Sequence, residues 1–190
     1  IGGSATNDGG AGMAQALGAK LTDENKKPID LGGLALNEIT KIDISGIDPR
    51  INESEILVAC DVNNPLCGPN GASFIYGPQK GASPEMVKTL DDALYHFGSQ
   101  LIRDTGINIM EIEGSGAAGG IGGGMVGFLN AKLKPGIEIV LDSLDFDKSL
   151  KNVDLVITGE GQIDFQTVFS KAPIGVAKHA KKYNITVIAI

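Results

Sequence analysis

Glycine is concentrated in a few short segments of this chain, and the densest of them constrains the fold most. Between Gly114 and Gly127, eight of fourteen residues are glycine, out of 27 glycines in the 190-residue chain. Because each glycine inside a helix costs about 1 kcal/mol relative to alanine, this segment cannot sustain a helix by its own propensity. We therefore expect either close packing against another part of the backbone or a loop that faces an anion.

A second glycine-rich segment opens the chain, with the sequence Ile-Gly-Gly-Ser-Ala-Thr-Asn-Asp-Gly-Gly-Ala-Gly. A helix is predicted directly after it, over residues 13–17. Backbone N–H groups at the start of a helix attract phosphate or carboxylate groups. Ser4, Thr6 and Asn7 can donate further hydrogen bonds, and Asp8 can accept a proton or hold a metal ion. A glycine turn that caps the helix without binding a ligand is the alternative.

The overall charge argues against a nucleic-acid-binding protein. The formal net charge is −7 and the isoelectric point is near 4.8, whereas nucleic-acid-binding domains normally present a basic face. No apolar run reaches the ~18 residues of a membrane-spanning helix. Cys60 and Cys67 lack the spacing of a zinc or redox motif, so we expect free thiols in a reducing compartment, the cytoplasm. His96 and His179 are isolated in the sequence.

The order of apolar and helical patterns predicts an α/β protein whose sheet is largely parallel, at least in its C-terminal part. Ser83 and Pro84 mark the start of a long helix, which Gly106 ends. The apolar run 56–60 is expected to be a strand buried on both faces. Further helices are predicted over 31–39, 146–150 and 173–183, a hairpin over 20–29, and strands over 41–44, 108–113, 137–141, 154–158 and 185–190.

Acidic residues follow several of these predicted strands, where parallel sheets bind their ligands. Asp61 follows the strand 56–60, Asp142 follows the strand 137–141, and Glu160 and Asp164 follow the strand 154–158. Carboxylates at such positions suit metal binding or general-base catalysis, although caps and turns use the same residues. Lys171 begins the next helix, where its charge opposes the helix dipole unless an anion is bound.

The segment Gly114–Gly119 also matches G-x-G-x-x-G, the fingerprint of dinucleotide-binding proteins. It follows the predicted strand 108–113, and Asp142 would take the place of the acidic residue that holds a ribose. An NAD(P)-dependent oxidoreductase is therefore one alternative function, and a non-catalytic domain that binds small organic acids is another. The chain has no G-x-x-x-x-G-K-[ST] motif, so a nucleotide would be held by another device.

Six blocks of sequence, in order along the whole chain, resemble the bacterial glycerate kinase family. They are residues 1–13, 59–72, 76–82, 116–120, 158–161 and 171–177, and they include Thr-Gly-Glu-Gly and Lys-Ala-Pro-Ile-Gly-Val-Ala. The resemblance implies phosphorylation of D-glycerate with ATP and Mg²⁺, with 2-phosphoglycerate as the product in many bacterial members. It also implies two α/β domains, one Rossmann-like and the other inserted into it, with the active site in the cleft between them.

Under this resemblance, residues 1–150 would be mostly the inserted domain and residues 151–190 a truncated part of the Rossmann-like domain. The chain begins inside the family's sequence, so we expect a fragment that lacks kinase activity by itself. Gln162 and Ser170 stand where the family usually has Arg and Gly, and losing an arginine removes a fork-shaped phosphate donor. The expected partner is the small molecule glycerate, with neither nucleic acid nor membrane, and a homodimer stays open.

Candidate roles for single residues follow from residue type and position. Asp164, Asp8 and Lys171 are predicted to be catalytic, and Asp164 is the first choice for a base or a metal-holding carboxylate. Glu160 and Asp61 are the predicted metal ligands, and the resemblance does not settle which carboxylate is the base. Binding of substrate or phosphate is predicted for Gly2, Gly3, Ser4, Thr6, Asn7, Asn64, Lys80 and Gln166.

Overall fold

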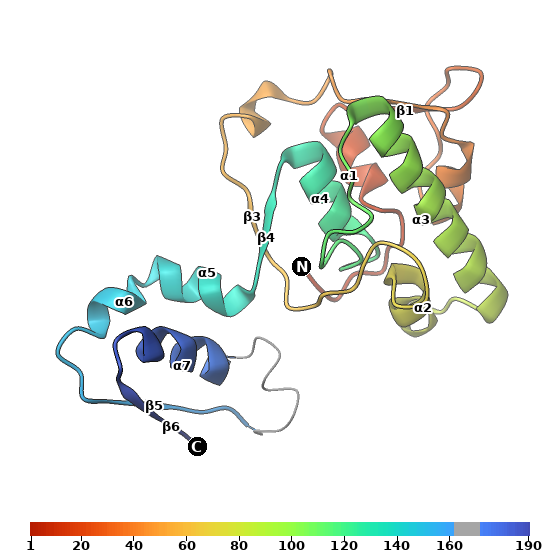
Figure 1. Ribbon diagram of the computed structural model, residues 1–190. Helices are drawn as coiled ribbons and strands as arrows, with labels where there is room; N and C mark the ends of the chain where they lie inside the picture. The colour runs from red at the N-terminus through yellow and green to blue at the C-terminus, as the bar shows by residue number, and fades with distance from the viewer. Residues whose placement is uncertain (162–171) are drawn as a thin grey trace. The chain divides into compact units, whose positions relative to one another are not determined.

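The computed structural model describes residues 1–161 and 172–190, and the chain divides into two compact units, Ile1–Leu133 and Lys134–Ile190. Figure 1 labels the elements. The first unit contains α1 (Ala11–Ala16), β1 (Lys20–Thr22), η1 (Gly33–Glu38), β2 (Lys41–Asp43), η2 (Pro49–Ile51), β3 (Leu57–Ala59), α2 (Ala72–Tyr76), η3 (Pro78–Lys80), α3 (Pro84–Thr105) and α4 (Ile121–Leu129). β4 (Lys132–Lys134) lies at the boundary. The second unit contains α5 (Gly136–Ser143), α6 (Phe146–Ser149), β5 (Leu155–Thr158), α7 (Ala172–Lys182) and β6 (Thr186–Ala189).

Helix α3 is the longest helix of the first unit. Its two ends confirm the helix that the sequence predicted between Ser83 and Gly106. The Ser83 hydroxyl accepts a hydrogen bond from the N–H of Met86 at 3.3 Å, which caps the start of the helix. Gly106 ends it in the left-handed conformation with φ +77°. Leu94, Phe97 and Leu101 are fully buried on one face, and their side chains belong to the main hydrophobic core. The helix therefore supports the elements around it, in particular η1 and β2.

Helix α4 forms despite its four glycines, because it lies against other backbone segments. A Cβ atom on Gly124 would lie 2.2 Å from the carbonyl oxygen of Gly9, and one on Gly122 would lie 2.2 Å from that of Gly114. Only glycine allows contacts this close. Of the two explanations for this glycine-rich segment, the structure therefore shows close packing against other backbone. This packing holds the opening segment of the chain against α4.

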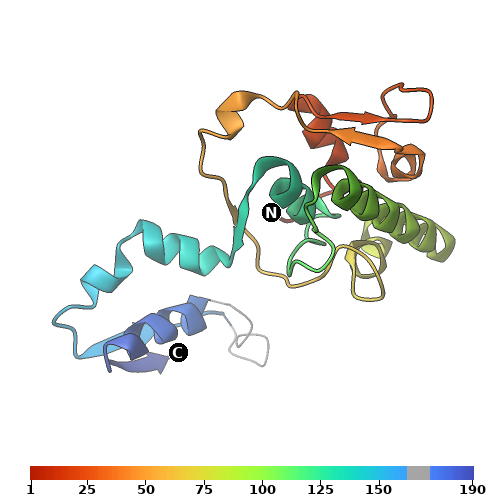
Figure 2. The same cartoon turned by 45° about the horizontal axis from the view of Figure 1, so that its top comes forward.

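The strands form three two-stranded ladders among the described residues. β1 pairs with β2 in antiparallel fashion, with Leu21 opposite Ile42, and Figure 2 shows the two as adjacent arrows. The predicted hairpin over 20–29 is present: residues 23–27 form its turn, and the return segment pairs with β1 through the antiparallel bridge of Thr22 with Pro28. Its arms share only this bridge, and the longer ladder of β1 is with β2. β3 is buried on one face only, since Val58 is buried while Leu57 is 41% exposed.

Two predicted strands are wrong. Residues 108–113 form no strand but a loop that buries Ile109, and turns follow it through Gly120. Residues 137–141 lie in helix α5, in which Leu141 is buried and Ile137 contacts Gly175 of α7. Packing between the two helices overrides the strand preference of the branched residues in this run. Asp142 therefore lies within a helix, 3.4 Å from the Lys134 ammonium, and does not follow a strand.

The C-terminal unit matches its prediction more closely. β5 and β6 pair in parallel with α7 between them in the chain, and α6 covers the predicted helix near 146–150. The helical pattern of residues 173–183 predicts that Val176, Ala177 and Ala180 face inward and that the lysines face outward. Ala180 is buried and Lys178, Lys181 and Lys182 are exposed, as predicted, whereas Val176 and Ala177 are only half-buried. Their expected place on the buried face is taken instead by Pro173, Gly175 and His179.

His179 joins three helices of this unit. Its imidazole Nε2 lies 3.0 Å from the Glu138 carboxylate of α5, and its Nδ1 lies 2.5 Å from the Asp147 carboxylate of α6. The side chain is only 7% exposed. Hydrogen bonds to Glu138 and Asp147 raise the pKa of His179, because both carboxylates favour the charged imidazolium. His179, which is isolated in the sequence, thus links α5, α6 and α7 through its side chain.

Candidate functional site

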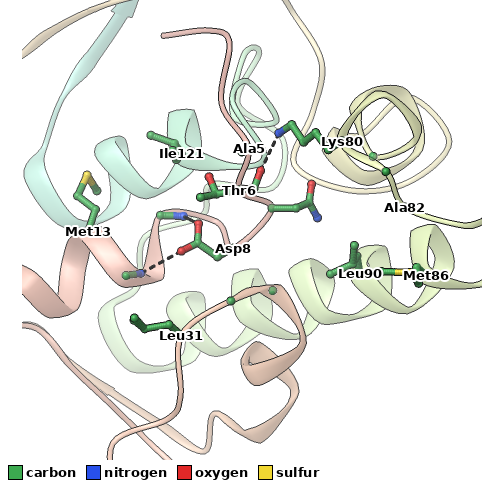
Figure 3. Close-up of a pocket in the computed structure, with 17 residues that line it drawn as sticks. Ala5, Thr6, Asp8, Met13, Leu31, Lys80, Ala82, Met86, Leu90 and Ile121 are labelled. Carbon is green, nitrogen blue, oxygen red and sulfur yellow. Dashed lines mark hydrogen bonds between the residues drawn. The ribbon is translucent and has the colours of Figure 1, made fainter.

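A cavity of about 660 Å³ lies in the first unit, between the opening segment, η1, α3 and the start of α4 (Figure 3). Its polar side chains come from the opening segment and from the end of η3: Thr6, Asn7, Asp8 and Lys80. Apolar side chains form much of the remaining wall: Met13, Leu31, Met86, Leu90 and Ile121. Polar groups on a mostly apolar wall are typical of a small-molecule site.

Asp8 is held at the floor of this cavity by the start of α1. Its carboxylate accepts hydrogen bonds from the N–H groups of Gly10, at 3.1 Å, and Gly12, at 3.2 Å, and the residue is 8% exposed. Both bonds are drawn in Figure 3. The amides that were expected to meet an external anion are therefore occupied by Asp8 itself. The geometry gives Asp8 a capping role, and it also presents the residue to the cavity.

Lys80 extends from the end of η3 to the opening segment. Its ammonium donates to the Ser4 hydroxyl at 3.0 Å and to the Thr6 carbonyl oxygen at 2.6 Å. Partial burial lowers the pKa of Lys80, and the negative charge of Asp8 partly opposes this shift. An ammonium group has three N–H donors, so the two bonds fix its position and leave a donor for a ligand.

A second, smaller cavity of about 120 Å³ adjoins Lys80. It is lined by the opening residues Gly2, Gly3 and Ser4, and by Tyr76, Gln79 and Lys80 among others. A Cβ atom built on Gly2 or Gly3 would meet no atom within 4 Å, but Gly3 has φ +64°, a backbone conformation that favours glycine. The opening segment thus contributes to both cavities, with Ser4 in the smaller and Thr6 in the larger.

The two predicted asparagines have different surroundings. The Asn7 amide donates to the Ser73 hydroxyl at 2.9 Å, and its Oδ1 is buried with no hydrogen-bond partner among the described residues. The Asn64 side chain is engaged at both ends, donating to the Asn70 carbonyl at 2.8 Å and accepting from the Tyr76 hydroxyl at 2.6 Å. Asn7 lines the larger cavity, whereas Asn64 lines neither and holds the 64–76 segment together.

The structure does not bring the remaining predicted residues into these cavities. Asp61 is exposed after β3 and lines neither cavity, and Glu160 follows β5 in the second unit. Asp164, Gln166 and Lys171 lie outside the described residues, as do Gln162 and Ser170. Across residues 1–161 and 172–190, no group of three or more His, Cys, Asp or Glu side chains is placed to hold a metal ion.

The G-x-G-x-x-G segment lacks the surroundings of a dinucleotide site. No strand precedes it over residues 106–113. A Cβ atom on Gly116 would lie 2.1 Å from the Pro65 carbonyl oxygen, and one on Gly119 would lie 2.0 Å from that of Thr6. These glycines approach protein backbone and not a pyrophosphate, so the dinucleotide interpretation is wrong.

Sequence reasoning missed the apolar wall of the larger cavity. Helical spacing places Met86 and Leu90 on one face with Leu94, Phe97 and Leu101 and so predicts that they face the core, but Met86 is 49% exposed and both residues line the cavity. Leu31 is 78% exposed and lines it as well. The available signal was position: Met86 lies in the first turn of α3, beyond the part of the helix that the core covers.

No described helix is both long and apolar enough to cross a membrane.

Comparisons with known proteins agree on one family. The model of the Glycerate kinase family matches residues 1–190. The chain is 55% identical to "Glycerate kinase" of Halalkalibacterium halodurans, 57% identical to "Glycerate kinase" of Haemophilus influenzae and 54% identical to "Glycerate 2-kinase" of Escherichia coli K12. Each alignment covers 100% of this chain and 50% of the relative.

A solved structure gives the same result. The chain matches a crystal structure from Salmonella typhimurium LT2, solved as that of a candidate glycerate kinase 2, with a TM-score of 0.90 and 53% identity. The match covers 100% of this chain and 50% of that one. The mixed α/β fold expected from the sequence is therefore confirmed, and the chain spans about half the length of the relatives that it matches.

Proposed function

Because this chain belongs to the glycerate kinase family, we propose that the protein containing it phosphorylates D-glycerate with ATP. The favoured product is 2-phosphoglycerate. The match of all 190 residues to the family, at 54–57% identity to three relatives named as glycerate kinases, is the observation that carries this proposal. No observation favours the oxidoreductase or the non-catalytic acid-binding domain.

The polar side of the larger cavity supports phosphoryl transfer. That reaction needs reactants held in line and the negative charge of the phosphates neutralised. Lys80 supplies a positive charge whose position is fixed by Ser4 and Thr6. Asp8 supplies a carboxylate whose orientation is fixed by two backbone N–H groups. We assign Lys80 to phosphate or substrate binding and Asp8 to a catalytic or positioning role.

The proposed base or metal-holding carboxylate remains Asp164, with Lys171 as a second phosphate-neutralising residue and Gln166 as a binding residue. All three follow β5, in a segment outside the described residues. Asn7, Asn64, Gly2 and Gly3 complete the proposed binding set.

We propose that a magnesium ion arrives together with ATP. Mg²⁺ is usually bound through one or two carboxylates together with substrate phosphates and water, and not by a cage of protein ligands. Asp61 and Glu160 are our candidates for the carboxylates. Bound Mg²⁺ would neutralise charge on the transferring phosphoryl group.

We further propose that residues 1–150 belong mostly to an inserted domain and residues 151–190 to a Rossmann-like domain. The parallel β5–β6 pair, with α7 between the strands in the chain, supports the second assignment. The compact units divide at Leu133–Lys134, so α5 and α6 go with the C-terminal unit. Two free cysteines, Cys60 and Cys67, support a reducing compartment such as the cytoplasm.

The test is an assay of the full-length protein with D-glycerate and ATP, in which the product is identified by phosphorus NMR. We expect ADP and a single phosphoglycerate, with the phosphate on the 2-hydroxyl. Glycerate binding detected by calorimetry without turnover would favour the acid-binding domain. Failure to convert glycerate under conditions in which an authentic glycerate kinase is active would refute the proposal.

A further inference from the structure

The imidazole of His179 faces more hydrogen-bond acceptors than a neutral ring can serve. Its Nε2 lies 3.0 Å from the Glu138 carboxylate of α5, and its Nδ1 lies 2.5 Å from the Asp147 carboxylate of α6 (Figure 1). A charged imidazolium donates from both nitrogens, whereas a neutral imidazole has one N–H and one lone pair. One of the two helices must therefore lose its direct bond to α7 whenever His179 is neutral.

Lys182 favours one of the two neutral forms of the ring. Its ammonium lies one helical turn after His179, 3.5 Å from Nδ1 and 3.8 Å from the Oδ2 of Asp147. When Nδ1 carries a proton, the ammonium faces another donor, whereas a lone pair on Nδ1 can accept a hydrogen bond from it. The pKa of Asp147 is lowered chiefly by its bond to His179, but also by Lys182 and Tyr183, so Asp147 keeps favourable partners without the ring. The neutral ring should therefore keep its proton on Nε2, facing Glu138.

The other charged groups around the ring are paired with each other. Asp142 of α5 lies 3.4 Å from the Lys134 ammonium, and Asp145 lies 2.6 Å from the Lys148 ammonium of α6. The strands β5 and β6, which also pack against α7, contain no ionisable residue. The protonation of the ring is therefore governed by the two carboxylates that face it and by the neighbouring ammonium group.

A cavity of about 280 Å³ provides the room for a rearrangement. It is lined by residues of α5, α6 and α7, among them Asp147 and His179. A polar cavity of this size can hold several water molecules of ~30 Å³ each. Because the Asp147 side chain is 41% exposed, water can replace the imidazole as its partner, whereas the His179 side chain is only 7% exposed. Asp147 is thus the more mobile member of this pair.

We propose that His179 is a pH-sensitive latch that releases α6 from α7 when it loses a proton, while α5 stays bound. The proton leaves Nδ1 for the solvent, and the lone pair left on Nδ1 repels the facing oxygen of Asp147. The Lys182 ammonium then moves between the two and bonds to both. The Nε2–H group continues to donate to Glu138. Leu150, which is buried directly after α6, keeps the end of that helix in place, so the release is local.

The direction of the pH dependence follows from the same contacts. Hydrogen bonds to Glu138 and Asp147 raise the pKa of His179 in the folded protein. The latch is therefore closed below the ordinary histidine value of ~6.5. It opens as the pH rises through the raised pKa of the folded state. This device does not depend on the proposed kinase reaction.

The first test is nitrogen-15 NMR of the full-length protein labelled at histidine, because ring nitrogen shifts show which nitrogen carries a proton. The His179 signal is the one that is absent in His179→Gln and that shifts in Lys182→Met. We expect both nitrogens to be protonated at low pH, and Nδ1 alone to lose its proton as the pH rises. A neutral ring with its proton on Nδ1 would overturn the proposal, because α5 and not α6 would then lose its bond.

The second test removes the ammonium that selects the neutral form. In Lys182→Met we expect the neutral ring to become a mixture in which a substantial share carries its proton on Nδ1. Lys181→Met is the matched control, because Lys181 is also exposed at the end of α7 and neighbours Lys182 in the chain. Its neutral ring should keep the wild-type form. A neutral ring in Lys182→Met that stays entirely in the Nε2–H form would refute the role of Lys182.

Hydrogen exchange of the full-length wild type, followed by mass spectrometry, tests the release itself. The backbone N–H groups of Lys148, Leu150 and Lys151 are hydrogen-bonded in and directly after α6. After correction for the effect of pH on intrinsic exchange, their exchange should speed up roughly ten-fold as His179 is deprotonated, as expected for the loss of one hydrogen bond to a charged group. Exchange in α5 should not change in this way.

The exchange result has two outcomes that would overturn the proposal. An equal acceleration in α5 and α6 would show that the whole unit loosens and that no single helix is released. No acceleration in α6 would show that Asp147 does not hold this helix to α7.

Discussion

Replacing Gly124 by alanine should destabilise the protein much more than the same replacement at its neighbour Gly123. A Cβ atom at position 124 would lie 2.2 Å from the carbonyl oxygen of Gly9, whereas close carbon–oxygen contacts in proteins lie at roughly 3.3–3.6 Å. α4 and the opening segment would therefore have to separate by about 1 Å. Because both atoms in conflict belong to packed segments, we expect a cost at or above the upper end of the ~1–3 kcal/mol typical of overpacking.

At Gly123 the neighbours can yield. A Cβ atom there would lie 3.1 Å from the terminal methyl of Ile109 and 3.3 Å from the Ser115 Cβ and carbonyl oxygen. Alanine also gains about 1 kcal/mol over glycine inside a helix, at either position. We therefore expect Gly123→Ala to stay within about 1 kcal/mol of wild type, and Gly124→Ala to lower the free energy of unfolding by a net ~2 kcal/mol or more.

Urea denaturation of the full-length variants measures this difference, provided that the slope of free energy against urea is the same in both. Turnover gives a second readout, since displacement of Gly9 also moves the neighbouring Asp8. We expect Gly124→Ala to lose activity at temperatures at which Gly123→Ala keeps it. Equal midpoints for the two variants would show that α4 does not press on the opening segment, and would refute the packing explanation of its glycines.

Lys80→Met keeps the length of the side chain and removes its charge, so kcat/KM should fall roughly 10²–10³-fold, as when a fixed electrostatic donor is removed; steady-state kinetics that show less than a ten-fold fall would contradict the assignment. Asp164→Asn should lower kcat roughly 10²–10⁴-fold with folding intact, and full kcat in Asp164→Asn together with none in Asp8→Asn would transfer the base role to Asp8. The pKa of His179 is raised in the folded protein, so its contribution to stability is complete below the unfolded value of ~6.5 and is lost as the pH rises through the folded pKa. The thermal midpoint of the wild type should therefore fall more between about pH 6 and pH 9 than that of His179→Gln. The expected difference is equivalent to about 1 kcal/mol, the size of a partly exposed charge-assisted hydrogen bond. Parallel pH profiles of the two proteins would contradict this prediction.

The elements that the sequence predicted well are those whose signals are local. Ser83 and Gly106 mark both ends of α3 through capping and a left-handed turn, and the structure confirms both. The strands β5 and β6 also lie where short apolar runs placed them. The predicted strand 137–141 failed because its branched residues fit either conformation. The contact of Ile137 with Gly175, which lies nearly forty residues later, favours the helix over the strand. No local sequence pattern contains that contact.

The glycines show why the candidate site was only partly predictable. For residues 114–127 the sequence left close packing and a loop facing an anion as alternatives, and for the opening segment it left ligand binding and a capping glycine turn. The structure separates some of these cases: a Cβ atom on Gly124 would meet the backbone of Gly9, and one on Gly9 would meet the Phe97 side chain, whereas one on Gly2 or Gly3 would meet no atom within 4 Å. Close packing accounts for glycine at positions 9 and 124, and a left-handed backbone conformation also favours it at positions 3 and 9. At position 3 the backbone conformation by itself favours glycine, with no bound ligand needed to explain it.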